Sequence, residues 1–226
     1  MGDLRLVIFD VDGTLVDSQG TIVLAMNAGL KHAGLAPLSR EKILSIVGLS
    51  LPEAAELLVP GGTPQQHADL AEGYRRAYRL EREAAGPTKS SPLYPGALET
   101  LTTLNGQPET LLGVATGKSK RGLDILIASY GLEKHFVTLQ AADFHPSKPS
   151  PSMVLQALDE AGVDAAQAVM IGDTTYDIEM GCAAGVKTIG VAWGYHAVED
   201  LLASGAHKIA TEFAQIPSLI DELLGA

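Results

Sequence analysis

Two aspartates separated by a single residue are the first side chains in this sequence that could do chemistry. Asp10 and Asp12 follow an apolar segment and belong to the run Phe9-Asp10-Val11-Asp12-Gly13-Thr14. Residues two apart in an extended chain point to the same side, so both carboxylates can face one site. One could attack phosphorus as a nucleophile, while the other donates and accepts protons. The pair predicts phosphoryl transfer, because that reaction needs an in-line nucleophile and a proton donor for the leaving oxygen.

A second pair of carboxylates follows another apolar segment late in the chain. Asp173 lies in the run Gly172-Asp173-Thr174-Thr175-Tyr176-Asp177, and Asp177 comes four residues after it. If the two pairs of aspartates meet, each like-charge contact at about 4 Å costs roughly 4 kcal/mol at an effective dielectric constant near 20. Such a cluster needs a cation, and carboxylates without histidine or cysteine favour magnesium over zinc. We therefore predict Mg²⁺ as the cofactor.

Two further segments could bind a phosphate group. An apolar segment ends at Thr116, and Gly117 then leads into an expected helix whose free amide groups can bind an anion. Lys148, in the run Ser147-Lys148-Pro149, also precedes an expected helix. Its ammonium group could neutralise a phosphate oxygen and reduce the repulsion between the carboxylates. An ordinary helix cap and a solvated lysine are the alternative interpretations of these segments.

These side chains need a scaffold that brings the ends of strands together. Short apolar segments alternate with segments of helical periodicity, which predicts an α/β fold with a doubly wound, mainly parallel, Rossmann-like sheet. Ligands of such sheets bind at the carboxyl ends of the strands, where Asp10, Thr116 and Asp173 lie. The expected strands are 4–9, 111–115, 136–139, 168–171 and 188–191, and the expected helices of this part are 96–104, 118–130, 150–161 and 177–184.

One stretch of the chain breaks the alternation of strands and helices. From about residue 19 to 85 the pattern is helical, with expected helices at 21–33, 40–47, 51–58 and 63–85. The following run, 86–92, is rich in glycine, proline and serine and predicts a linker. We therefore expect a helical cap domain with its linker at 18–92, inserted into a Rossmann-like catalytic core formed by 1–17 and 93–226.

Composition and charge narrow the possible partners. The chain has 226 residues and a formal net charge of −11, and an acidic surface repels polyphosphate backbones. We expect a small phosphorylated metabolite as the partner and no nucleic acid. No apolar run is long enough to span a membrane and no signal-peptide pattern is present, which favours a cytoplasmic protein with no membrane partner. We expect a monomer or a homodimer. The single cysteine, Cys182, excludes an intrachain disulfide and is expected in the core.

Taken in order, the four segments resemble the motifs of the haloacid dehalogenase superfamily. The run Leu93-Tyr94-Pro95-Gly96 is similar to the return to the core in its phosphoglycolate-phosphatase-like members. The resemblance implies that Asp10 is the nucleophile and a metal ligand, and that Asp12 is the general acid and base and offers its backbone carbonyl to the metal. It also implies that Thr116 and Lys148 hold the phosphate.

The same resemblance implies roles for the remaining carboxylates and for one loop of the cap. Asp173 would bind Mg²⁺, and Asp177 would support it or orient Lys148 from behind. The loop Gly48-Leu49-Ser50-Leu51 is the candidate for substrate specificity. Relatives that act as β-phosphoglucomutase carry arginine at the position of Leu51, and its replacement by leucine disfavours a mutase. The alternative interpretation of Leu51 is the start of an apolar helix face.

The resulting expectation is a Mg²⁺-dependent phosphatase that hydrolyses a small phosphate monoester, with 2-phosphoglycolate as the leading substrate. A pyrophosphatase, a 5′-nucleotidase and a β-phosphoglucomutase are the enzyme alternatives. A noncatalytic phosphate-binding regulatory module and a receiver-like domain are the alternatives from another class. The receiver-like alternative predicts no helical insert after the first strand, and the noncatalytic one predicts the loss of a motif residue. The sequence has the insert and retains every motif residue.

Overall fold

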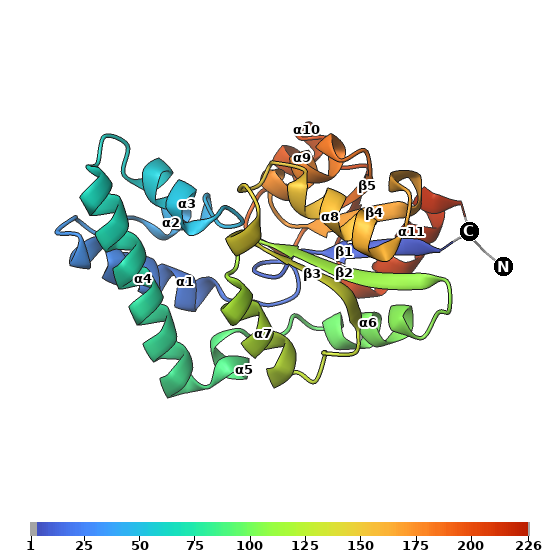
Figure 1. Cartoon of the computed structure of the whole chain (residues 1–226), viewed down its shortest axis with the longest axis horizontal. Coiled ribbons are helices and arrows are strands. Elements are labelled where there is room, and N and C mark those ends of the chain that lie inside the picture. Colours follow the sequence, from blue (N-terminus) through green and yellow to red (C-terminus); the bar gives the residue numbers. More distant parts are fainter. Residues whose placement is uncertain (1–3, 226) are drawn as a thin grey trace.

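A parallel sheet with helices on both faces forms the larger part of the structure, a computed structural model that describes residues 4–225 (Figure 1). All its strands are parallel, in the order β3-β2-β1-β4-β5-β6. The order reverses beside β1, which places a crevice at the carboxyl ends of β1 and β4. The expected α/β, doubly wound fold is confirmed. The strands are β1 (Arg5–Phe9), β2 (Thr110–Thr116), β3 (Phe136–Ala141), β4 (Ala168–Gly172), β5 (Lys187–Val191) and β6 (Lys208–Ala210).

Helices connect these strands and cover the sheet. Figure 1 shows α8 and α9 on one face and α6 and α7 on the other. The helices are α6 (Ala97–Asn105), α7 (Lys120–Ser129), α8 (Ser152–Ala161), α9 (Thr175–Ala183), α10 (Val198–Ala203) and α11 (Ile216–Leu224). Single turns of 3₁₀ helix lie at Ala142–Phe144, Ala165–Gln167 and Phe213–Gln215.

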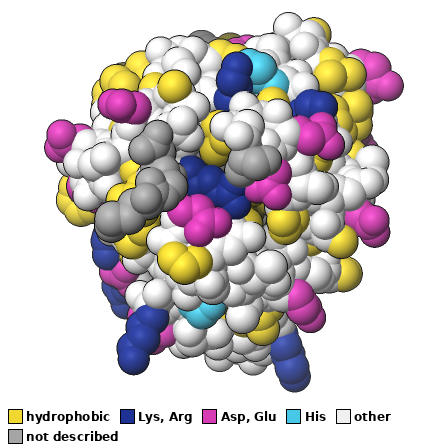
Figure 2. Space-filling view, turned by 90° about the vertical axis from the view of Figure 1, so that its right-hand side faces the viewer, with side chains coloured by type: hydrophobic (Ala, Val, Ile, Leu, Met, Phe, Trp, Pro, Cys, Tyr) yellow, Lys and Arg dark blue, Asp and Glu magenta, His cyan; other side chains and the backbone are white. Residues whose placement is uncertain are grey.

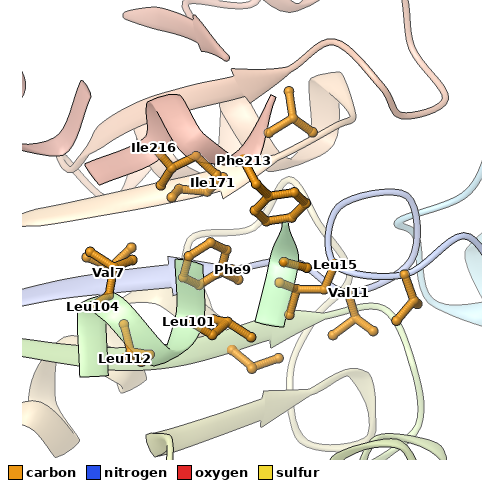
Figure 3. Close-up of a cluster of buried hydrophobic side chains, with 14 of the residues drawn as sticks. Val7, Phe9, Val11, Leu15, Leu101, Leu104, Leu112, Ile171, Phe213 and Ile216 are labelled. Atoms are coloured by element: carbon orange, nitrogen blue, oxygen red, sulfur yellow. The ribbon is translucent and has the colours of Figure 1, made fainter. Parts of the chain in front are cut away.

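The central strand β1 is buried on both faces, and its side chains alternate between two apolar clusters. Val7 and Phe9 belong to the cluster beneath α6, α7 and α11, whereas Leu6 and Ile8 belong to the cluster beneath α8 and α9. Figure 3 shows Phe9 surrounded by side chains of the first cluster. This packing holds β1 firmly in place, and with it the residue that follows Phe9.

Several details of the core differ from the sequence-based expectation. The strand β6 and the helices α10 and α11 were not predicted. The strand is difficult to recognise because it is only three residues long and half-buried at the sheet edge. Helix α7 begins at Lys120, two residues later than expected, because the Ser119 hydroxyl accepts a hydrogen bond from Gly122 N at 3.3 Å and caps the helix there. The expectation that Cys182 lies in the core is wrong. Cys182 is exposed, and its neighbour Gly181 faces the sheet instead.

The end of the core near the chain termini is closed by contacts of Arg5. Its guanidinium group lies 2.6 Å from Asp221 Oδ1 and donates hydrogen bonds to Gln107 and Thr110.

Figure 2 shows that acidic and basic side chains are interspersed on the face of the molecule near the chain termini, with no extended patch of one sign. Among residues 4–225, no helix is both long and apolar enough to cross a membrane.

A separate group of helices, here called the cap, lies beyond the carboxyl ends of the strands (Figure 1). It falls within the segment 18–92 that was expected to form a cap domain. The expected linker contains a short helix, α5, and α2 ends at Leu44 rather than Val47, because the chain turns there. The cap helices are α1 (Gln19–His32), α2 (Arg40–Leu44), α3 (Leu51–Leu58), α4 (Pro64–Ala85) and α5 (Pro87–Ser90).

Two glycines allow α1 and α4 to pack closely. A Cβ atom at Gly29 would lie 2.5 Å from the backbone oxygen of Leu70, and one at Gly73 would lie 2.9 Å from Gly29 Cα. Around this crossing, buried side chains such as Met26 and Ile43 form an apolar cluster of the cap's own. The close crossing therefore positions α4 relative to the rest of the cap.

We predict that Gly29→Ala destabilises the protein by about 1–3 kcal/mol, because the added methyl group must push α1 and α4 apart. The free energy of unfolding in urea would measure the effect. Gly20→Ala is the matched control, since no atom lies within 4 Å of a Cβ at this position of the same helix. The control should be unchanged or slightly more stable. Equal unfolding free energies for the two variants would contradict the tight crossing.

Candidate active site

Three aspartates meet at the crevice between β1 and β4. Asp10 directly follows β1 and Asp173 directly follows β4, and the register pairs Phe9 with Ile171, so the two strands end side by side. Asp177 reaches the same place from the first turn of α9. All three are buried, and one carboxylate oxygen of each lies within 4.8 Å of the others. The structure thus brings Asp10 of the first pair together with both aspartates of the second pair.

The ammonium group of Lys148 lies among these carboxylates. Its Nζ is 2.7 Å from Asp10 Oδ1 and 2.6 Å from Asp177 Oδ1, and its side chain is fully buried. Burial lowers the pKa of Lys148, but the charges of Asp10 and Asp177 outweigh burial and raise it, so the lysine is charged. Lys148 therefore reduces the repulsion between the carboxylates, as the sequence suggested. A single ammonium group cannot balance three carboxylates.

The surrounding chain holds Asp173 and Asp177 in fixed orientations. Asp173 accepts hydrogen bonds from Thr14 Oγ1 at 2.8 Å and from Tyr195 N at 3.0 Å. Asp177 Oδ2 accepts from the backbone and the hydroxyl of Thr174, which leaves Oδ1 to bind Lys148. Both carboxylates are therefore positioned before any ligand arrives.

Glycines make room for the Asp173 carboxylate. A Cβ atom at Gly13 would lie 2.2 Å from Asp173 Oδ2, and one at Gly194 would lie 2.0 Å from Asp173 Cβ. Gly13 also has a φ of +94°, a conformation that favours glycine. The sequence pattern Asp-Gly-Thr after β1 is thus required by the close approach of Asp173, which comes from a different strand.

One oxygen of Asp10 has no partner although it is buried. Asp10 Oδ2 makes no hydrogen bond, whereas Oδ1 binds Lys148. Burial raises the pKa of Asp10 to about 7, against the opposing effect of Lys148, and Asp177 adds to the rise. Burial and the charges of Asp177 and Asp10 also hold the pKa of Asp173 well above its usual value. An unpaired oxygen beside two more carboxylates fits a divalent cation with oxygen ligands.

Asp12 occupies a different environment from Asp10. Its Oδ2 lies 2.9 Å from Lys118 Nζ, and its Oδ1 accepts a hydrogen bond from Ser18 Oγ at 2.5 Å. Lys118 Nζ also donates to the hydroxyl of Tyr78 in α4 at 3.1 Å. The carboxylate of Asp12 is thereby linked to the cap. The sequence analysis assigned no role to Lys118, although its place directly after Gly117, before a helix, was the available signal.

The predicted phosphate loop and the predicted specificity loop touch each other. Thr116 ends β2, and its hydroxyl accepts a hydrogen bond from Lys118 N at 3.2 Å. A Cβ atom at Gly117 would lie 2.5 Å from the carbonyl oxygen of Gly48 and 2.7 Å from that of Leu49. Only a glycine at position 117 allows the cap loop to come this close to the core.

Two hydrogen bonds fasten this loop, and Ser45 at the end of α2, to other parts of the core. Ser50 N donates to Ser147 Oγ at 2.8 Å, one residue before Lys148. The hydroxyl of Tyr176, in α9, donates to the carbonyl oxygen of Ser45 at 3.2 Å. The cap is therefore closed over the crevice in this structure.

Between cap and core lies a cleft of about 710 Å³. Asp10 and Asp12 lie on its wall, together with both loops, whereas Lys148, Asp173 and Asp177 lie behind the wall. The cleft brings the following predicted residues together: Asp10, Asp12, Gly48, Leu49, Ser50, Leu51, Thr116 and Gly117. A ligand in the cleft would therefore meet Asp10 and Asp12 directly, with the buried charges beneath them.

Comparison with known proteins agrees with this arrangement. Residues 7–191 match the family described as haloacid dehalogenase-like hydrolase. The chain is 35% identical over 221 residues to the probable phosphatase IndB of Dickeya dadantii, covering 97% of this chain and 94% of that protein. It is 31% identical over 226 residues to a phosphoglycolate phosphatase of Agrobacterium fabrum, with coverages of 97% and 94%. The crystal structure of a predicted phosphoglycolate phosphatase from Haemophilus somnus superposes with a TM-score of 0.84 at 24% identity, covering 97% of this chain and 99% of that one.

The unbalanced carboxylates predict that a divalent cation stabilises the protein. Because the pKa of Asp10 is raised from 3.8 to about 7, the folded state holds a proton that the unfolded state has lost. The stability of the metal-free protein should therefore fall as the pH rises from about 4 to 7. A divalent cation would replace that proton, so Mg²⁺, the ion expected from the sequence, should stabilise the protein more at pH 8 than at pH 5. At a Mg²⁺ concentration 100 times the dissociation constant, we expect Tm to rise by about 5–10 °C.

Thermal unfolding with and without Mg²⁺ would measure this effect. Asp173→Asn should lose the Mg²⁺-dependent rise in Tm, whereas Asp159→Asn, on the exposed side of α8, should retain it. A Tm that Mg²⁺ leaves unchanged at pH 8 would contradict a cation site at these carboxylates.

Proposed function

Because the chain belongs to the haloacid dehalogenase-like hydrolases, we propose that it is a Mg²⁺-dependent phosphatase that hydrolyses a small phosphate monoester through an aspartyl-phosphate. The observation that carries the proposal is the state of Asp10. Its Oδ2 is buried and unpaired, its Oδ1 is held by Lys148, and the residue lines the cleft. This is the geometry that a nucleophilic carboxylate needs before a substrate arrives.

In the first step, a carboxylate oxygen of Asp10 attacks the phosphorus atom of the substrate. The bond between phosphorus and the leaving oxygen breaks, and the electron pair of that bond stays with the leaving oxygen. Asp12, in its protonated form, donates a proton to this oxygen, so that an alcohol departs. The products are the alcohol and a phosphorylated Asp10.

In the second step, Asp12 acts as a general base. Its carboxylate accepts a proton from a water molecule as the water oxygen attacks the phosphorus of the aspartyl-phosphate. The bond between phosphorus and the carboxylate oxygen of Asp10 breaks, which regenerates the carboxylate of Asp10 and releases inorganic phosphate. The contacts of Asp12 with Ser18 and Lys118 hold its carboxylate at the cleft during both steps.

The carboxylates of Asp10 and Asp173 and the backbone carbonyl of Asp12 would hold the Mg²⁺ ion. When bound, the ion neutralises negative charge on the phosphoryl group. Asp177 acts from behind by orienting Lys148, at an Nζ to Oδ1 distance of 2.6 Å. The buried, fixed position of Asp173 supports its assignment as a ligand.

The phosphoryl oxygens would be bound by groups on the cleft wall. We assign the hydroxyl of Thr116 and the backbone of Gly117 to this role, as expected from the sequence, together with Lys148 from beneath. Lys118 is a further candidate, because its ammonium group lines the cleft and is already held by Asp12. Positive charge at this place is needed, since the protein as a whole carries a net charge of −11.

As the first substrate to test we propose 2-phosphoglycolate, which the relative from Agrobacterium fabrum is named for. Leu51 lines the cleft at the position where mutase relatives carry arginine, which supports hydrolysis over isomerisation. A noncatalytic module would not need the complete set of carboxylates beside a cleft. We propose a small metabolite as the partner of a monomer or homodimer, with no nucleic acid or membrane partner.

Removal of the nucleophile should abolish turnover. We expect Asp10→Asn to lower kcat/KM for an aryl phosphate at least about 10³-fold, because the amide cannot form the phosphorylated intermediate. Release of p-nitrophenol in the presence of Mg²⁺ would measure the rate. Asp159→Asn should match the unmodified protein. Undiminished turnover by the Asp10 variant would rule out the proposed mechanism.

A panel of phosphorylated metabolites would identify the reaction. We expect Mg²⁺-dependent release of phosphate from phosphate monoesters, with kcat/KM compared between 2-phosphoglycolate, pyrophosphate, nucleoside 5′-monophosphates and hexose phosphates. Preference for pyrophosphate or for the nucleotides would replace the proposed substrate with one of the alternatives. Isomerisation of β-glucose 1-phosphate without phosphate release would overturn the phosphatase assignment.

A further inference from the structure

The cleft contains an unusual concentration of arginine for so acidic a protein. Four of the seven arginines of the chain line it. Arg75, Arg79 and Arg82 come from α4 in the cap, and Arg121 comes from the first turn of α7 in the core. We call the three arginines of α4 the arginine row. Its members are spaced by four and three residues, so they follow one side of the helix over about 10 Å.

Within the described part of the chain, these arginines have no ionic partner. Among residues 4–225, none of the four lies within 4.0 Å of a carboxylate oxygen. Carboxylates are available on the same helix, since Glu83 follows Arg79 by four residues, the spacing at which ion pairs form. Like charges at this spacing, such as Arg75 and Arg79, destabilise a helix slightly. The row therefore contributes positive charge to the cleft rather than ion pairs to the helix.

A chain of contacts fixes where the row stands relative to the reacting carboxylates. Asp12 binds Lys118, and Lys118 donates to the hydroxyl of Tyr78 at 3.1 Å. Tyr78 lies within the row: Arg75 precedes it by three residues and Arg82 follows it by four, so both flank Tyr78 on the same side of α4. The row thus runs across the cleft directly above the point where Asp12 is held.

The acidic groups on the cleft wall do not cancel this charge. Besides Asp10 and Asp12, which Lys148 and Lys118 bind, the wall carries the carboxylates of Glu53 and Asp143. Asp143 accepts a hydrogen bond from Lys120 N and is thereby directed to the start of α7. Two carboxylates therefore face four guanidinium groups in the part of the cleft that Asp10 and Asp12 do not occupy.

The size of the cleft indicates a leaving group longer than that of phosphoglycolate. A volume of about 710 Å³ lies within the range of pockets that enclose ligands of several hundred daltons. A two-carbon phosphate ester would fill only a small part of it. A second anionic group would find the arginine row if a spacer of several atoms separated it from the phosphate at Asp10.

We propose that the arginine row binds a second anionic group, a phosphate or a carboxylate, at the far end of the leaving group. The substrate is then an organic phosphate with a second anionic group, of the bisphosphate or carboxylated-ester class, with a sugar-sized spacer between its two anionic ends. This inference rests on the proposed function for the reaction at Asp10. Planar guanidinium groups suit it, because each can donate two parallel hydrogen bonds to either anion.

Three aryl phosphates of the same size range can test the row. They are phenyl phosphate, 4-carboxyphenyl phosphate and 1,4-phenylene bisphosphate. We expect kcat/KM to be about 10- to 100-fold higher for the two esters with a second anionic group than for phenyl phosphate, the factor that a charge-assisted hydrogen bond provides. Because 1,4-phenylene bisphosphate has two equivalent phosphates that can react, this statistical effect alone would raise its kcat/KM by a factor of only about two. A carboxylate or phosphate preference between the two esters identifies which anion the row takes.

Variants of α4 separate the row from the charge of the helix as a whole. In Arg79→Gln/Arg82→Gln, the ratio of kcat/KM between the esters with and without a second anionic group should fall towards one. Arg76→Gln removes the same kind of charge from an exposed position of α4 that does not line the cleft, and should keep the ratio. Comparing ratios between variants cancels the differences in leaving-group chemistry. An equal ratio in all proteins, or no preference in the unmodified protein, would overturn the proposal.

A binding experiment distinguishes failure of this inference from failure of the proposed function. Calorimetric titration of 1,4-phenylene bisphosphate and phenyl phosphate into the Asp10→Asn variant measures affinity without turnover. We expect tighter binding of the bisphosphate by about 10-fold or more, lost when Arg79 and Arg82 are also replaced by glutamine. If none of the esters is hydrolysed and this difference is still found, the reaction is wrong and the row stands. If hydrolysis occurs and the difference is absent, the row is wrong and the reaction stands.

Discussion

The structure depends on an electrostatic imbalance at the carboxyl edge of its sheet. Three buried aspartates share one buried lysine, and the Nζ of Lys148 is within hydrogen-bond distance of only Asp10 and Asp177. Burial makes every carboxylate charge that Lys148 does not neutralise energetically unfavourable, and for this reason the pKa of Asp10 is raised. The site thus remains in a high-energy state until a proton or a cation compensates it. A rigid surrounding is required, because a flexible one would let the carboxylates move apart.

That rigidity comes from the sheet and from glycines placed where chains approach most closely. The strand β1 is buried because its side chains, including Phe9, pack into an apolar cluster on each face of the sheet (Figure 3). This packing determines the position of Asp10, the next residue. Gly13 and Gly194 make room for Asp173 because neither carries a side chain, and the Asp173 carboxylate accepts a hydrogen bond from Thr14. The packing of the core thereby preorganises the reacting groups.

Polar contacts join the cap to the site, in addition to the packing of Tyr176 and Tyr195 against the apolar cluster of the cap. The hydrogen bond from Lys118 to Tyr78 joins α4 to the group that holds Asp12, and Ser50 binds the loop before Lys148. Single hydrogen bonds of this kind can break and re-form as ligands enter and leave. At the same time they bring the basic face of α4 over the carboxylates. The cleft therefore combines an acidic floor with a basic roof, which suits a ligand that is anionic at both ends.

Much of this arrangement could be predicted from the sequence, because the essential signals are local. A run of apolar residues that ends in Asp10-Val11-Asp12-Gly13 predicts a strand and a site at its end, and the same logic identified Asp173. The sequence could not predict β6, since three residues at a sheet edge carry no periodicity. Nor could it place Cys182, because two sides of a short helix differ only in what packs against them.

The types and order of the reacting residues were thus determined by the sequence alone, as was the need for a cation to compensate them. Only the tertiary structure decided which charges meet. Lys118 and the arginines of α4 are ordinary basic residues in the sequence, and they gain a role because the cap folds back over β1 and β2. Contacts between segments far apart in the chain depend on the packing of the whole molecule, and no local pattern encodes them.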